Sequence, residues 1–162
     1  MEMGSLKACF EALGFLDVST YINSGNVIFT TKKTSESKLA SGIEQAIEKT
    51  FDFPVRTVVR TAANIEKVAK AIPDKWTNDK EQKTDVLFLW DDFDSKDSLK
   101  LIVTNAKVDT LKYVDGAIIW HLEKKHYSKS GMKKFIGTPV YKNMTARNAN
   151  TVRKLAELLQ VD

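Results

Sequence analysis

Two short polar segments in the last third of the chain carry side chains suited to binding an anion. They are Ser128-Lys129-Ser130, followed by Gly131, and Thr145-Ala146-Arg147-Asn148. Each precedes a stretch of helical character, and a helix N-terminus offers free N–H groups and the positive end of a dipole. Arg147 could hold a phosphate or carboxylate through two parallel hydrogen bonds. The other interpretation is that Thr145 or Asn148 caps the helix and Arg147 pairs with a nearby acid.

Basic residues concentrate in the same region. The chain of 162 residues has a formal net charge of +4. From position 121 to the end, nine basic residues oppose three acidic ones, so this part carries +6 and the first 120 residues carry −2. Such an end suggests an anionic partner, either a small ligand or nucleic acid. The alternative is that these lysines only keep exposed helices solvated.

Three carboxylates, Asp91, Asp92 and Asp94, follow an apolar run that predicts a buried strand. Carboxylates at the end of a strand can hold Mg²⁺, which prefers oxygen ligands. Capping of the next helix by Asp94 or Ser95 is the more common use of such residues, and we favour it. No metal is therefore expected.

The remaining reactive side chains give no recognisable catalytic pattern. His121 and His126 have no accompanying cysteine or carboxylate cluster, so a zinc site is not expected. The single cysteine, Cys9, lies on the apolar side of a predicted helix, which indicates a buried thiol. The glycine-rich and G-x-S-x-G motifs of nucleotide-binding proteins and hydrolases are missing from the sequence. No cofactor is expected, and whether the protein is an enzyme stays open.

A third polar segment, Asn23-Ser24-Gly25-Asn26, joins two runs rich in β-branched and aromatic residues. Glycine and asparagine accept the backbone angles of tight turns, so the segment predicts the tip of a β-hairpin. These residues either close the turn alone or contact a ligand. In the second case we expect a pocket between the two halves of the chain, lined by Asn23, Asn26, Arg147 and Asn148, for a small anionic or amide-bearing ligand.

Hydrophobic spacing predicts the elements that position these residues. In residues 1–60 it predicts a helix near 6–13, the hairpin, a helix that Thr34 or Ser35 caps, and a strand at Val55–Arg60. In residues 61–162 it predicts helices near 62–71, 95–103, 129–136 and 148–159, a buried strand at 86–90 and a hairpin around Asp115-Gly116. We take 1–60 and 61–162 as two subdomains.

All three polar segments belong to longer stretches of the sequence. The motif Tyr21-Ile22-Asn23-Ser24-Gly25-Asn26-Val27-Ile28-Phe29 resembles a signature of the bacterial domain-of-unknown-function family 1697. The stretch 145–155 is similar to that family's T-x-R-N-W-N-T-V-x-K-L ending, with Ala149 in place of Trp, and 128–132 is similar to a weaker third block. The resemblance implies no known activity.

The resemblance also implies a fold. The family opens with a strand and a glycine-rich loop that we expect this chain to lack. With that strand restored, the order in the first half would be βαββαβ. We therefore expect an α+β protein whose ferredoxin-like N-terminal half misses its first strand and packs on a second α+β half of similar element order. Two strands would then need another neighbour, so a homodimer formed by strand addition is expected as one solution.

The location and function follow as expectations. A single cysteine, the lack of an apolar run of membrane-spanning length and a polar start favour the cytoplasm and no membrane partner. We expect a protein that binds an anionic ligand through its basic C-terminal region. The alternatives are a nucleic-acid-binding module and an enzyme of unknown reaction that acts on a small anionic or amide-bearing substrate.

Overall fold

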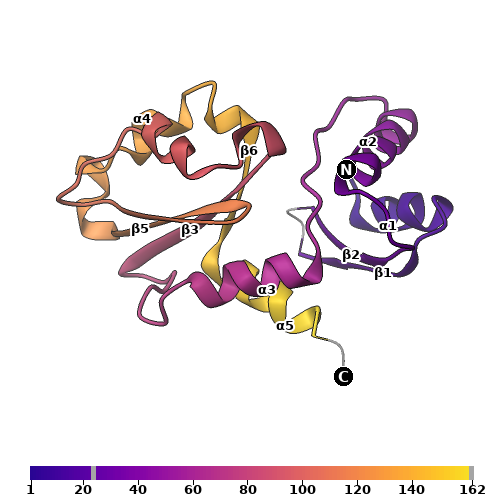
Figure 1. The fold of residues 1–162 in the computed structure, drawn as a ribbon, viewed down its shortest axis with the longest axis horizontal. Coiled ribbons are helices and arrows are strands. Elements are labelled where there is room, and N and C mark those ends of the chain that lie inside the picture. Colours follow the sequence, from indigo (N-terminus) through magenta and orange to yellow (C-terminus); the bar gives the residue numbers. More distant parts are fainter. Residues whose placement is uncertain (23–24, 161–162) are drawn as a thin grey trace. The chain divides into compact units, whose positions relative to one another are not determined.

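The computed structural model describes residues 1–22 and 25–160. The chain forms two compact units, Met1–Arg60 and Thr61–Asp162, and each combines helices with an antiparallel sheet (Figure 1). The α+β class expected from the sequence is confirmed.

The first unit is built around the predicted hairpin. Its elements are α1 (Met3–Ala12), β1 (Leu16–Tyr21), β2 (Asn26–Thr30) and α2 (Glu36–Phe51). The strands β1 and β2 pair antiparallel, with Ser19 opposite Ile28. Ser35 caps α2, because its hydroxyl accepts a hydrogen bond from the Lys38 N–H over 3.2 Å. The hairpin and this cap are confirmed.

The core of the first unit lies between the hairpin and its two helices. Its buried side chains are Leu6, Cys9, Phe10, Val18, Ile43 and Ile47. Phe10 meets Phe15 and Phe29 edge to face, and these last two rings stack 4.4 Å apart. Cys9 lies inside this cluster and contacts the Thr50 hydroxyl, so the prediction of a buried thiol is confirmed.

The strand predicted at Val55–Arg60 does not form in the part of the chain that the structure describes. Val55 and Val59 pack against the core, as alternate residues of a strand would. The Thr57 N–H donates to the Glu44 carboxylate of α2 over 2.7 Å. The sheet of this unit is therefore the β1–β2 pair, and the ferredoxin-like description of the first half stays a prediction.

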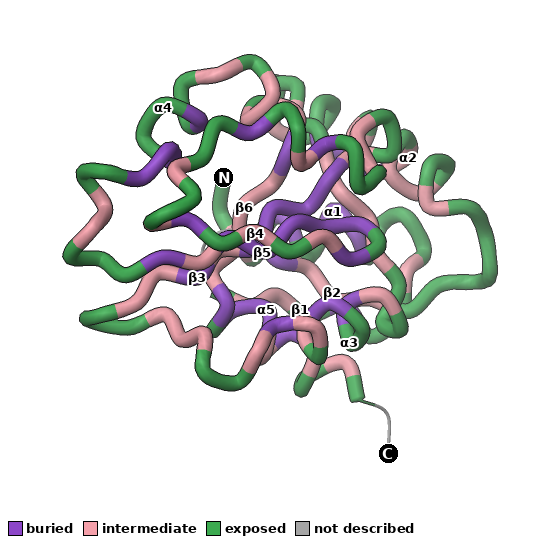
Figure 2. The backbone as a smooth tube through the Cα atoms, turned by 60° about the vertical axis from the view of Figure 1, so that its left-hand side comes forward, coloured by how far each residue is buried: buried purple, intermediate pink, exposed green. Residues whose placement is uncertain are grey.

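The second unit is larger and centres on a four-stranded antiparallel sheet of order β4-β5-β3-β6. Its elements are α3 (Ala62–Ala71), β3 (Gln82–Leu89), η1 (Asp91–Phe93), η2 (Lys96–Leu101), β4 (Thr110–Val114), β5 (Ala117–Glu123), η3 (Lys124–Lys129), α4 (Met132–Ile136), η4 (Tyr141–Asn143), β6 (Met144–Asn148) and α5 (Ala149–Leu158), where η denotes a 3-10 helix. Buried residues run along β3 and β5 (Figure 2). The sheet thus has a central pair of strands and two edges.

Each face of this sheet has its own cover. Leu87 and Trp120 point to the same face as the buried Met132 and Phe135 of α4. On the opposite face, Lys112 reaches the Ala71 carbonyl at the end of α3 over 2.9 Å. The helices α3 and α5 pack on each other there, and Figure 1 shows them crossing one side of the sheet while α4 lies on the other. We call these two sides of the sheet the α3–α5 face and the α4 face.

The structure corrects two expectations in the second unit. The helix expected near 95–103 is the 3-10 helix η2. The segment Thr145-Ala146-Arg147-Asn148, expected to be a polar lead into a helix, belongs to the edge strand β6, with Thr145 opposite Phe88 of β3. Pairing with the buried strand β3 gives a strand to a segment that contains alanine and asparagine, which are residue types of low strand propensity.

Candidate functional site

The first predicted anion site, at Ser128–Gly131, surrounds a carboxylate of the protein itself. Asp109 is 7% exposed. Its Oδ1 accepts hydrogen bonds from Trp120 Nε1 over 3.0 Å and Ser130 Oγ over 2.5 Å. Its Oδ2 accepts from the backbone N–H of Asn105 over 2.9 Å and of Gly131 over 2.8 Å. The donors that the sequence predicts for a ligand here thus converge on an internal anion.

These donors decide the charge state of the carboxyl group. Burial by itself raises the pKa of Asp109, but the hydrogen bonds from Asn105, Ser130, Gly131 and Trp120 outweigh it and hold the pKa below its usual value. Asp109 is therefore ionised at neutral pH. The Ser130 hydroxyl also accepts from the Met132 N–H over 3.0 Å, so the same group of residues starts α4.

Gly131 is fixed at this point by a close approach of two backbone segments. A Cβ atom on Gly131 would lie 2.0 Å from the Val103 carbonyl oxygen and 2.8 Å from the Thr104 Cα. The Asn105 side chain donates to the Lys129 carbonyl over 3.0 Å and adds a further link between the same segments. The chain that follows η2 and the start of α4 are thus held together.

The elements held by Asp109 carry a stretch that we call the lysine segment, residues 124–142. It contains six lysines and no aspartate or glutamate. All six side chains are exposed: Lys124, Lys125, Lys129, Lys133, Lys134 and Lys142. Lys125 lies 3.2 Å from the exposed carboxylate of Glu123, and Lys133 lies over the Tyr127 ring, 5.9 Å from its centre. Exposed ion pairs of this kind hold their lysines weakly.

The predicted residues Ser128 and Lys129 are exposed within this segment, whereas Ser130 is buried. Ser130 therefore has a structural role, whereas Ser128 and Lys129 are exposed and can be reached by a ligand.

The second predicted group, on β6, lies on the other side of the sheet. Met144 and Ala146 pack on the α4 face. Thr145 and Arg147 alternate with them along the strand and so point to the α3–α5 face. Arg147 is half-buried, its guanidinium donates to the Ala146 carbonyl over 2.8 Å, and burial lowers its pKa. The structure does not bring Arg147 together with Ser128–Ser130.

Asn148 has the structural role that the sequence offered as an alternative. Its side-chain oxygen accepts a hydrogen bond from the Thr151 N–H over 3.0 Å and caps α5. Asn148 as a helix cap is confirmed.

The hairpin residues are placed only in part. Asn23 and Ser24 lie outside the described residues. Asn26 is buried, and its side-chain amide donates to the Tyr21 carbonyl over 3.0 Å, which closes the hairpin. Asn26 belongs to the first unit and Arg147 to the second. The pocket expected between the halves remains a prediction.

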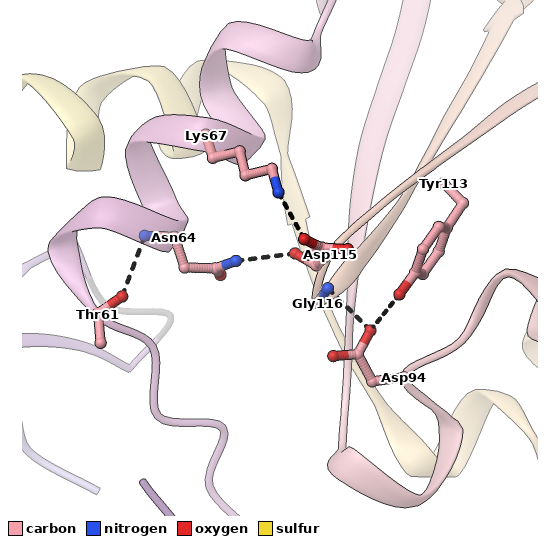
Figure 3. A network of polar contacts seen from close by, with 7 residues as sticks. All are labelled: Thr61, Asn64, Lys67, Asp94, Tyr113, Asp115 and Gly116. Atoms are coloured by element: carbon pink, nitrogen blue, oxygen red, sulfur yellow. Dashed lines mark hydrogen bonds and ion pairs between the residues drawn. The ribbon is translucent and has the colours of Figure 1, made fainter. Parts of the chain in front are cut away.

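The Asp94 carboxylate holds a β-turn and does not cap a helix (Figure 3). Its Oδ1 accepts from the Tyr113 hydroxyl over 2.7 Å and from the Gly116 N–H over 2.8 Å. The expectation of a cap is wrong, since neither Asp94 nor Ser95 makes a side-chain cap bond at η2. Burial and the neighbouring Asp94 raise the pKa of Tyr113 to about 12.

The same turn is fixed from α3. The Asn64 amide donates to the Asp115 carbonyl over 2.8 Å, and Lys67 pairs with the Asp115 carboxylate at 2.5 Å (Figure 3). The described residues include no group of three or more His, Cys, Asp or Glu side chains that could hold a metal. The hydrogen bonds of Asp94 and the contacts of Asp115 with α3 all hold the turn in place, so we interpret the Asp94–Asp115 network as structural.

His121 forms a second polar group, partly buried on the α3–α5 face. Its ring stacks on Trp76 with centres 4.8 Å apart, and its Nδ1 lies 2.8 Å from the Thr84 hydroxyl. Arg153 of α5 donates to the carbonyls of Pro73 and Trp76 and fixes the segment that carries this tryptophan. Burial lowers the pKa of His121, opposed by the charge of Glu123. His121 is therefore uncharged at pH 7.

Comparison with known proteins identifies the family. The model of the family described as protein of unknown function (DUF1697) matches residues 1–120, and the chain belongs to this family. The matched residues include the hairpin motif and end before the two C-terminal motifs. No curated protein matches the chain at a significant level.

A solved structure has the same fold. The conserved bacterial protein SP0830 from Streptococcus pneumoniae superposes with a TM-score of 0.82 at 25% sequence identity. The match covers 99% of this chain and 89% of that chain.

The described residues include no helix long and apolar enough to cross a bilayer.

Proposed function

We propose that the protein binds an anionic ligand through the lysine segment. The observation that carries the proposal is the set of six exposed lysines in a stretch of 19 residues without one acid. Asp109 fixes the chain between η3 and α4, which carry five of these lysines, through Ser130 and Gly131. A fixed cluster of one sign attracts counter-charge more strongly than scattered lysines do.

The arrangement favours an extended anion over a small one. The point at which donors converge, around Asp109, is filled by that carboxylate. The six lysines are spread over three short helices, η3, α4 and η4. A surface or chain that carries many negative charges can meet several of them at once, whereas a small anion meets one or two.

The test is binding to fluorescein-labelled heparin, a polyanion with no lipid and no bases. The variant Lys133→Glu/Lys134→Glu should bind much more weakly than the wild type. Its matched control is Lys32→Glu/Lys33→Glu, an adjacent pair of exposed lysines in the first unit that changes the net charge equally. Equal weakening by both variants would show a response to net charge alone and would refute the proposed site.

Nucleic acid is the alternative anion expected from the sequence. Tyr113 and Trp120 of the sheet pack in the core of the second unit, so bases could not stack on them there. Binding would then rest on phosphate contacts and would fall steeply as salt rises. A single-stranded oligonucleotide of mixed sequence, titrated at two salt concentrations, measures this.

An enzyme or small-molecule binder is the other alternative. The half-buried guanidinium of Arg147 is the feature that favours it. A thermal-shift screen of metabolites tests it, because a ligand of the native state raises the melting temperature. Arg147→Ala should abolish a true hit.

Two further properties complete the proposal. A single buried thiol, Cys9, suits the reducing cytoplasm. A homodimer formed by strand addition beside the β1–β2 pair would extend a two-stranded sheet that is small on its own. Light scattering decides this point, since a monodisperse monomer would rule the dimer out.

A further inference from the structure

We propose that the extended anion bound by the lysine segment is the surface of a bilayer that contains anionic lipids. This inference rests on the proposed function and names the class of its ligand. It adds a second kind of contact, since aliphatic side chains beside the lysines would enter the interface between headgroups and acyl chains.

Three exposed aliphatic residues belong to segments that pack on the α4 face, as the lysines of α4 do. Ile136 is 44% exposed, Val103 is 54% exposed and Leu101 is 48% exposed. In α4, Met132 and Phe135 are buried, so the helix turns Lys133, Lys134 and Ile136 outward together. Single exposed aliphatic residues are ordinary on protein surfaces, but here they accompany a cluster of one charge.

Val103 lies next to this helix. Its carbonyl oxygen is the atom closest to the Cβ position of Gly131, one residue before α4 begins. Ile102, between Leu101 and Val103, is buried in the same cluster as Met132 and Phe135. The outward-facing aliphatic residues of both segments therefore belong to one layer on the α4 face.

This combination fits a lipid surface. Binding to membrane surfaces strengthens with the apolar area that enters the interface and with attraction between Lys or Arg and anionic headgroups. A nucleic acid would gain from exposed aromatic rings. The tyrosines of the segment are only partly available, since Tyr127 and Tyr141 pack on the core cluster and Tyr141 meets Phe135 edge to face.

Acidic residues on the same face limit the area that contacts lipid. Asp97 pairs with Lys100 at 3.6 Å, and Asp91 and Asp92 are exposed in η1. The contact is therefore centred on α4 and Val103 rather than on η1. Contact of this kind needs no membrane-spanning helix.

The test is sedimentation of the full chain with vesicles of phosphatidylcholine alone and of phosphatidylcholine mixed with phosphatidylglycerol. The mixed vesicles should bind, and the neutral ones should bind about tenfold more weakly or not at all. Lys133→Glu/Lys134→Glu should lose most of the binding, whereas Lys32→Glu/Lys33→Glu should keep it. Ile136→Ser and Val103→Ser should each weaken binding several-fold.

The aliphatic control is Leu158→Ser, because Leu158 is 46% exposed on α5, which belongs to the α3–α5 face. It should bind like the wild type. Circular dichroism of each variant checks that the fold is retained.

Each outcome separates the two proposals. Binding to heparin or to an oligonucleotide through Lys133 and Lys134, without binding to the mixed vesicles, overturns the lipid inference and leaves the proposed function standing. Vesicle binding that ignores Ile136→Ser and Val103→Ser also overturns it, since the contact would then be electrostatic alone. Failure to bind heparin, oligonucleotide or vesicles overturns both.

Discussion

The indole Nε1 of Trp120 donates a hydrogen bond to Asp109 Oδ1 over 3.0 Å, inside the second unit. The same oxygen accepts a hydrogen bond from the hydroxyl of Ser130. Trp120 of the central strand β5 and Ser130, two residues before α4, are therefore tied by one carboxylate. This link holds the lysine segment on the sheet, so the stability of the unit and the presentation of the lysines depend on the same group.

Asp109→Asn should destabilise the second unit by about 2–3 kcal/mol, because the amide that replaces one oxygen would face two donors that then lose their acceptor. All three tryptophans, Trp76, Trp90 and Trp120, lie in the second unit, so tryptophan fluorescence during urea unfolding follows it selectively. Asp97→Asn is the control, since Asp97 is exposed and should change the stability by less than about 1 kcal/mol. Equal effects of the two variants would contradict the assigned role of Asp109.

Gly131→Ala should lower the free energy of unfolding, whereas Gly42→Ala should raise it. The methyl group that Gly131→Ala adds would collide with the Val103 carbonyl, which is backbone and yields only if the segment moves, so we expect a loss of about 3 kcal/mol or more. Gly42 lies inside α2 with open space at its Cβ position, and Gly42→Ala should stabilise the first unit by about 0.5–1 kcal/mol. Urea unfolding followed by circular dichroism measures both. A neutral Gly131→Ala would show that the two segments are not held together.

The stability of the second unit should fall as the pH drops below about 6.5, the ordinary pKa of histidine, and His121 should cause part of that fall. The pKa of His121 is lower in the folded state than in the unfolded chain. As the pH falls, the unfolded chain therefore binds the proton first and is stabilised relative to the folded state. The stability that the neutral His121 ring contributes is fully present above the pKa of the unfolded chain and is lost as the pH falls through the pKa of the folded state. Urea unfolding at several pH values between about 7.5 and 5, a range chosen around the ordinary pKa of histidine, gives the slope of the free energy of unfolding against pH.

His121→Gln should flatten this slope, and His126→Gln, which leaves the stack on Trp76 intact, should keep it. A slope unchanged in His121→Gln would mean that burial of this ring does not govern the acid sensitivity.

Much of the fold could be predicted where local signals and packing agree. The apolar run of β3, the Asp115-Gly116 turn and the Ser35 cap each carry their own signal, and the structure has all three. Val55–Arg60 has residue types of a strand, but a strand also needs a hydrogen-bonding neighbour, and no local signal reports one. The strand β6 shows the reverse, since its pairing with β3 overrides weak strand propensity.

The candidate site was predictable in composition but not in geometry. The run of lysines is visible in the sequence, and so are the donors at Ser130 and Gly131. Nothing near Asp109 in the sequence indicates that it meets Trp120 and Ser130, because the turn and strands between them bring these residues together. Alternation along β6 likewise places Arg147 on the face away from the lysines, which only the register of the sheet decides.

The central claim is that the lysine segment is the anion-binding surface, and the dissociation constant for heparin at low salt tests it most directly. We expect Lys133→Glu/Lys134→Glu to weaken binding by about tenfold or more relative to Lys32→Glu/Lys33→Glu, with all three proteins losing affinity as salt rises. The same dissociation constant for both charge-reversed variants, or wild-type binding that ignores salt, would contradict the account.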